Sequence, residues 1–190
     1  MGYRGYVVKY HIKWEGKRSA YFYQRFFRAI YGYTQVVVKS NGRRYVYYRR
    51  GVLTDYPYIK AGKTTVIVPD TAFQPLLRFL KTGKNPAHNF SYVSNWAETV
   101  RYAIEETTVD DRSAGEAVLS ALHRVRVQLA TGSPPALTLI DNFETLEPDQ
   151  LYALYYSIKG IVGSEWFTAL QSVDNQLYDR VKFFLNLVSL

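Results

Sequence analysis

The chain has 190 residues, is 47% hydrophobic, contains no cysteine and carries a formal net charge of +8. The hydrophobic content excludes a disordered protein, and the absence of cysteine excludes disulfides, thiolate catalysis and cysteine-ligated zinc. No run of about 18 apolar residues and no signal-peptide pattern is present, so we expect a cytoplasmic protein that has no membrane partner. The absence of cysteine and the single methionine also fit a protein from a thermophile.

Basic residues gather in the first half of the chain. Residues 1–91 contain 17 Lys or Arg and three acidic residues, whereas residues 92–190 contain 7 basic and 13 acidic residues. This asymmetry is typical of a protein in which one part meets a polyanion. We therefore expect a basic α+β nucleic-acid-binding domain over residues 1–88 and an acidic helical domain over residues 89–190. The second domain would support the first, bind a protein partner or form homo-oligomers.

A strand and a helix are predicted at the start of the chain. Apolar and polar residues alternate from Gly5 to Trp14, which is typical of a half-buried strand. Residues 17–31 instead have helical spacing, and Gly32 can end this helix because glycine adopts the left-handed conformation. The outer face of the predicted helix would offer a stacking ring and guanidinium groups that suit phosphates. That face carries Arg18, Tyr21, Arg25 and Arg28.

The segment Tyr33–Arg50 is the strongest structural signal in the chain. Two runs of β-branched and aromatic residues flank Asn41-Gly42, a dipeptide that favours the type I′ turn of a two-residue hairpin loop. This loop predicts a register in which Val38 faces Tyr45 on an apolar, inward face. The other face would be cationic and aromatic, with Lys39 opposite Arg44, Val37 opposite Val46, Gln35 opposite Tyr48, and Tyr33 opposite Arg50. Because two cations placed opposite each other repel, we expect an anionic partner on this face.

The rest of the chain completes an α+β pattern. Residues 51–62 are predicted to connect, Thr64–Val68 to form a buried strand and Asp70–Lys81 a helix, so the basic domain has the order β-α-β-β-β-α. The second domain is predicted to be bundle-like, because its apolar residues have helical spacing. Its expected helices are Ser94–Thr107, Asp111 or Ser113 to Ala130, Pro148–Lys159 and Ser164–Val188, with Ala136–Ile140 as a strand or a helical turn.

Motifs for catalysis or cofactor binding are weak. Gly62-Lys63-Thr64 has the sequence that ends a phosphate-binding loop, but Pro57 occupies the position of the opening glycine. The three histidines lie far apart in the sequence, so no metal site is predicted. We therefore expect a non-enzymatic protein without catalytic residues, metal or cofactor. A metal-dependent nuclease stays an alternative, with Asp141 and Glu144 as the best remaining acids.

These patterns together favour a nucleic-acid-binding protein. Tyrosines between cations, such as Tyr48 between Arg44 and Arg50, can stack on unpaired bases while the cations hold phosphates. Single-stranded DNA or RNA is therefore favoured over duplex DNA. A protein-interaction or oligomerisation module is the main alternative, since Tyr and Arg are also enriched at protein interfaces. The expected binding residues are Arg18, Tyr21, Arg25, Arg28, Lys39, Arg43, Arg44, Tyr48 and Arg50.

Overall fold

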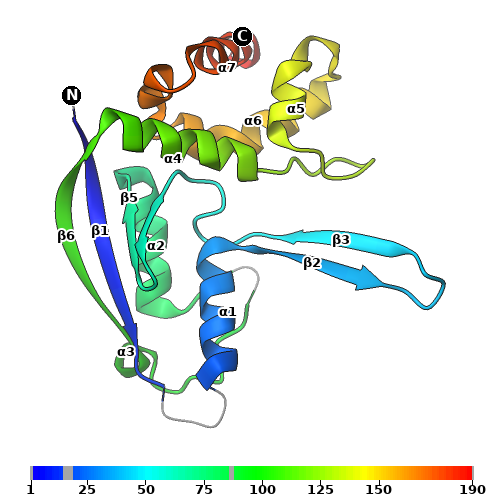
Figure 1. Ribbon diagram of the computed structural model, residues 1–190. Helices are drawn as coiled ribbons and strands as arrows, with labels where there is room; N and C mark the ends of the chain where they lie inside the picture. Colours follow the sequence, from blue (N-terminus) through cyan, green and yellow to red (C-terminus); the bar gives the residue numbers. More distant parts are fainter. Residues whose placement is uncertain (1, 15–18, 86–87, 190) are drawn as a thin grey trace. The chain divides into compact units, whose positions relative to one another are not determined.

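A computed structural model describes residues 2–14, 19–85 and 88–189 of the chain (Figure 1). The α+β class is confirmed, because helices occur together with antiparallel sheets. Contacts divide the chain into two compact units, each made of separate segments. We call Met1–Lys9, Asp55–Phe73 and Ile104–Leu190 the helical unit, and Tyr10–Thr54 with Gln74–Ala103 the arm unit. That residues 1–88 and 89–190 form separate domains stays a prediction.

The main sheet has four strands in the order β4-β5-β1-β6. Strand β1 pairs antiparallel with β5, with Tyr6 opposite Val68. The predicted alternation along β1 is confirmed, since Val8, Tyr10 and Ile12 are buried. The strands are β1 (Gly2–Ile12), β4 (Ile59–Gly62), β5 (Thr65–Val68) and β6 (Val100–Asp110).

Helices make up most of the helical unit. They are α4 (Asp111–Arg124), α5 (Ala136–Asp141), α6 (Pro148–Val162), α7 (Asn175–Val188) and the 3-10 helices η1 (Phe143–Thr145) and η2 (Phe167–Ser172). Trp166 lies fully buried in this unit, and its Nε1 donates a hydrogen bond of 2.8 Å to the carbonyl oxygen of Arg4. Within the described part of the chain, no helix is both long enough and apolar enough to cross a bilayer.

The arm unit is built on an aromatic core. Its elements are α1 (Ser19–Tyr31), β2 (Tyr33–Val38), β3 (Arg44–Arg49), most of α2 (Asp70–Thr82) and α3 (Trp96–Thr99). Neighbouring rings of the core have centroids 5.2 to 6.4 Å apart. These rings belong to Phe22, Phe26, Phe79, Phe90 and Trp96, and they anchor α1, whose C-terminal end carries the hairpin.

The helix predicted over Ser94–Thr107 is wrong. Only the short α3 is helical, and residues 100–110 form β6 beside β1. Val100, Tyr102 and Ile104 fit a two-residue period as well as a helical one, so the sequence pattern alone was ambiguous. Pairing in the sheet decides between them, and the guanidinium of Arg4 on β1 holds Glu106 on β6 with two hydrogen bonds of 2.9 and 3.0 Å.

Three further predictions need correction. The last helix does not run unbroken from residue 164, because η2 ends at Ser172 and Asp174 caps a new helix by accepting a hydrogen bond from Leu177 N at 2.9 Å. Residues 51–62 are not purely a connection, since they include β4. Helix α4 ends at Arg124 instead of Ala130. The segment from Ala136, left open between strand and helical turn, is helix α5.

Candidate functional site

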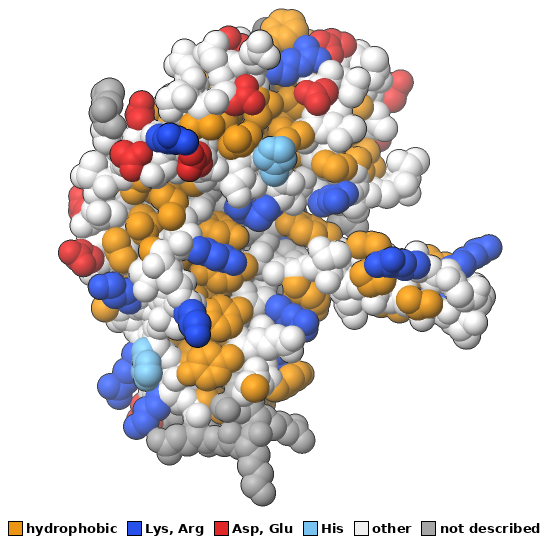
Figure 2. Space-filling view, in the orientation of Figure 1, with side chains coloured by type: hydrophobic (Ala, Val, Ile, Leu, Met, Phe, Trp, Pro, Cys, Tyr) orange, Lys and Arg blue, Asp and Glu red, His pale blue; other side chains and the backbone are white. Residues whose placement is uncertain are grey.

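Charge separates by unit as well as by halves of the sequence. The segments of the arm unit contain 14 Lys or Arg and two acidic residues, whereas those of the helical unit contain 10 basic and 14 acidic residues. On the face shown in Figure 2, the projecting hairpin carries Lys and Arg side chains beside hydrophobic ones and no acidic side chain. The arm unit is therefore the part of the chain whose charge suits a polyanion.

Strands β2 and β3 form a two-stranded sheet of their own, which we call the arm. The arm projects from the C-terminal end of α1 (Figure 1), and six strand residues span about 20 Å. The segment Tyr33–Arg50 contains five cations and no acidic residue. Val36, Val38, Val46 and Tyr47 of the arm are exposed. A two-stranded ribbon is only marginally stable by itself, and these apolar side chains are left exposed on it.

The hairpin is confirmed, but its predicted register is wrong by one residue. Three residues, Ser40 to Gly42, make the connection: Gly42 N donates to Lys39 O and Lys39 N donates to Arg43 O, both at 2.9 Å. Within the turn, only Gly42 has a positive φ, 76°, whereas a type I′ turn would also require a positive φ at Asn41. Val38 therefore pairs with Arg44 and Val37 with Tyr45. A shift of one residue moves every side chain of one strand to the opposite face of its partner strand.

One face of the arm alternates rings and cations, and we call it the tyrosine face. Lys39 Nζ lies 4.7 Å from the centroid of the Tyr45 ring, and Arg49 Cζ lies 5.4 Å from that of Tyr47. Arg49 Nε also donates a long hydrogen bond of 3.4 Å to Gln35 Oε1. Tyr45, predicted to be buried, is half-exposed on this face. The pairing places Tyr33, Gln35, Val37, Tyr45, Tyr47 and Arg49 on the tyrosine face.

The opposite face is apolar at its centre, and we call it the valine face. Val36 and Val46 pair directly across the strands. Val38, next along β2, is 64% exposed, and Val46 is 62% exposed. The face consists of Thr34, Val36, Val38, Arg44, Val46 and Tyr48. Arg44 and Tyr48, both expected on one cationic face with Lys39, therefore lie on the other side of the arm from it.

The root of the arm is held by backbone contacts. Gly32 ends α1 with a φ of 74°, as predicted, and its N donates to Arg28 O at 2.8 Å. A Cβ on Gly51 would lie 2.2 Å from Gly32 N, so the two chain segments meet where only glycine fits. Gly51 N donates to Thr54 Oγ1 at 2.8 Å, and Thr54 is fully buried. The arm therefore leaves α1 in a fixed direction.

The outer face of α1 brings two of its predicted residues together. Arg25 donates to Tyr21 Oη at 3.4 Å and to the carbonyl oxygen of Asn89 at 3.1 Å, and its Cζ lies 5.7 Å from the Phe90 ring centroid. Arg28 points to the arm instead, with its Cζ 4.5 Å above the Tyr33 ring. Arg18, the fourth residue of the predicted stripe, lies outside the described residues.

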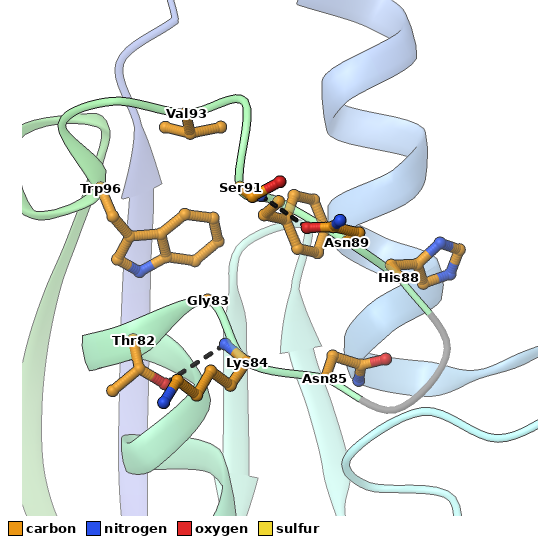
Figure 3. Close-up of a pocket in the computed structure, with 10 residues that line it drawn as sticks. Thr82, Gly83, Lys84, Asn85, His88, Asn89, Ser91, Val93 and Trp96 are labelled. Carbon is orange, nitrogen blue, oxygen red and sulfur yellow. Dashed lines mark hydrogen bonds between the residues drawn. The ribbon is translucent and has the colours of Figure 1, made fainter.

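A hollow of about 650 Å³ lies in the loop that follows α2 (Figure 3). Trp96 forms one side, and Asn85 and His88 lie on the other. Among the described residues, the hollow's lining includes Lys84 and no acidic side chain; these lining residues are Thr82, Gly83, Lys84, Asn85, His88, Asn89, Phe90, Ser91, Val93 and Trp96. Its size is within the range of small-ligand sites, although Lys84 N and Ser91 N already donate hydrogen bonds within the loop and Asn85 Nδ2 donates to Ala29 O of α1.

His88 links this loop to the root of the arm. Its ring stacks on Tyr33 with centroids 5.7 Å apart. Burial, followed by the positive charges of Arg25 and Arg28, lowers the pKa of His88, so the imidazole is neutral at neutral pH. His88 Nε2 is buried without a hydrogen-bond partner among the residues that the structure describes. In the sequence His88 is isolated, because the residues that it contacts in the folded chain belong to segments far from it in sequence.

Sequence reasoning missed four residues of the arm that contact one another or α1. Tyr33, Tyr45, Tyr47 and Arg49 carry the cation and ring contacts of the tyrosine face. A three-residue loop would have placed them there, since Gly as the last loop residue is also typical of hairpins with one bulge. Arg43 adjoins the turn, where its N donates to Asn41 Oδ1 at 3.0 Å, and Arg50 is exposed just after β3.

Acidic residues do not gather into a metal site in the parts of the chain that the structure describes. Among those residues, no three His, Cys, Asp or Glu side chains cluster so that they could hold a metal ion. Glu144 is instead paired with Arg180, whose Nη1 and Nη2 lie 2.5 and 2.6 Å from its carboxylate oxygens. These hydrogen bonds lower the pKa of Glu144, so its carboxylate is ionised at neutral pH.

No protein family, curated protein or solved structure matches this chain.

Proposed function

We propose that the arm unit binds nucleic acid, with the arm as its main contact surface and the outer face of α1 as a second one. One observation carries the proposal: a ribbon with both faces accessible contains five cations and no acidic residue. Repulsion among these cations opposes folding of the free ribbon, and a phosphate backbone would remove that cost. The protein binds without chemistry, so it needs neither metal nor cofactor.

The proposed contacts divide into two kinds. Lys39, Arg43 and Arg44, near the tip of the arm, contact phosphates and supply affinity that is independent of sequence. Tyr21 and Arg25 on α1 offer a ring and a guanidinium beside each other, 5.5 Å from centroid to Cζ, which suits contact with a base and its phosphate. The number of tyrosines favours single strands, whereas the cations that already lie over the rings of Tyr45 and Tyr47 oppose stacking of a base there, so the titration below compares both forms.

Fluorescence anisotropy at two ionic strengths tests this proposal. The titration uses the whole protein with a labelled 20-mer as single-stranded DNA, as duplex DNA and as RNA. Contact with about five phosphates predicts a slope near −4 in a plot of log affinity against log salt concentration. Weak binding that does not change with salt, for all three oligonucleotides, contradicts the proposal.

A protein-interaction or oligomerisation module is the second candidate. It is favoured by exposed apolar residues of the helical unit: Tyr152 and Tyr156 on α6 and Phe183 and Leu187 on α7 are each more than 40% exposed. Such residues are typical of the centres of protein interfaces. This candidate predicts a self-association or partner binding that survives at high salt. The described residues give no support to a metal-dependent nuclease, because they contain no cluster of metal ligands.

A further inference from the structure

The valine face is not explained by phosphate binding. Val36, Val38 and Val46 are 44%, 64% and 62% exposed, and they lie together on one side of the arm. Phosphates would contact cations and leave these apolar side chains in water. A partner that covers the valine face must therefore offer an apolar surface next to its negative charges.

A second copy of the chain fits this face poorly. Two arms packed through their valine faces would bring Arg44 of both copies into an apolar interface, with no acidic residue in either arm to pair with it. The three valines are also far too small a surface for the roughly 1,200 Å² that stable protein interfaces bury. Charge and area both point instead to an anionic partner with apolar groups recessed between its phosphates.

We infer that the arm enters the major groove of duplex DNA with its valine face on the base edges, an inference that rests on the proposed function. The groove is about 12 Å wide and admits a two-stranded ribbon. The 5-methyl groups of thymine line its floor and are the natural contacts of apolar side chains. Arg44 lies on the same face as the valines at the turn end of β3, where its guanidinium can contact a phosphate at the edge of the groove.

The opposite face then meets the walls of the groove. Side chains reach about 5 Å from the mid-plane of a ribbon on each side, since stacked sheets lie about 10 Å apart. The groove is about 8.5 Å deep, so the cations of the tyrosine face come level with the phosphates. Lys39 and Arg49 lie on this face, each over a tyrosine ring. With a cation already over those rings, they are poorly placed to stack on a base, which favours a duplex over a single strand.

A-form RNA is excluded as an equivalent partner by the same geometry. Its major groove is too deep and narrow for side chains to read. We therefore expect the protein to bind duplex DNA more tightly than duplex RNA or a single strand. Removal of the thymine methyl groups changes the floor of the major groove and leaves the phosphates unchanged, so it can serve as a probe.

The test compares a 20-base-pair DNA duplex containing A·T pairs with the same duplex in which deoxyuridine replaces every thymidine. Each buried thymine methyl predicts about a fourfold loss of affinity on replacement. The double variant Val36→Thr with Val46→Thr keeps strand preference but replaces one of the two methyl groups of each valine by a hydroxyl, so it should reduce this methyl sensitivity. Val37→Thr, on the tyrosine face, is the matched control and should respond like the wild type.

The outcomes separate this inference from the proposed function. Methyl sensitivity that is equal in the wild type and in Val37→Thr but reduced in the double variant supports it. Salt-dependent binding with equal affinity for both duplexes, or with tighter binding to the single strand or to duplex RNA, overturns the inference and leaves the proposed function intact. Binding to vesicles with an anionic lipid, without salt-dependent binding to any nucleic acid, overturns both.

Discussion

Two glycines at the root of the arm allow the close backbone contacts that hold it. Gly32 and Gly51 bring the end of α1 and the exit from β3 into backbone contact. Val52 N and Leu53 N then donate hydrogen bonds of 2.8 Å to Ala29 O and Ile30 O, so the chain after the arm completes the last turn of the helix. A side chain at either glycine would push the two segments apart.

Gly51→Ala should therefore destabilise the protein. Its Cβ would lie 2.2 Å from Gly32 N and 2.6 Å from Ile30 O, which the backbone can relieve only by moving. We expect a loss of about 1–3 kcal/mol in the free energy of unfolding, measured by urea denaturation. Gly62→Ala is the control, because its Cβ would come no closer than 3.7 Å to Thr65. Equal midpoints for the two variants would show that the root is not tightly packed.

The sequence predicted where most secondary-structure elements occur better than it predicted which side chains share a face of the arm. The hairpin, α1, β1 and the region of α6 lie where periodicity placed them. The faces of the arm could not be predicted, because Ser40-Asn41-Gly42 allows a two-residue or a three-residue loop and each gives a different register. Neither face is covered by a core, so burial gave no second signal to choose between them. Strand β6 was missed because its conformation depends on pairing with β1, which lies about 100 residues away in the sequence.

The stability of the arm should be separate from that of the core. Tyr45 lies on the tyrosine face under Lys39, so Tyr45→Ala should cost less than about 1 kcal/mol in thermal unfolding followed by circular dichroism. Phe26→Ala, which removes a fully buried ring of the arm unit, should cost about 3–5 kcal/mol. If Tyr45→Ala unfolds the protein as readily as Phe26→Ala, the tyrosine face is a core face after all.

On the scale of the whole molecule, charge is the feature that the sequence showed most directly. The sequence has a basic first half and an acidic second half, and each of the two units takes segments from both halves. The assembly of distant segments around α1, including the loop with His88 and Asn89, had no sequence signal, because these residues meet only in the folded chain.

The salt dependence of binding by an arm variant tests the central claim most directly. The variant replaces Lys39, Arg43 and Arg44 with Gln, and anisotropy with duplex DNA gives its slope of log affinity against log salt concentration. Loss of three phosphate contacts should make the slope shallower than that of the wild type by about 2.7. A control with Arg112, Lys159 and Lys182 of the helical unit replaced by Gln should keep the wild-type slope. An unchanged slope for the arm variant would contradict the assignment of nucleic-acid binding to the arm.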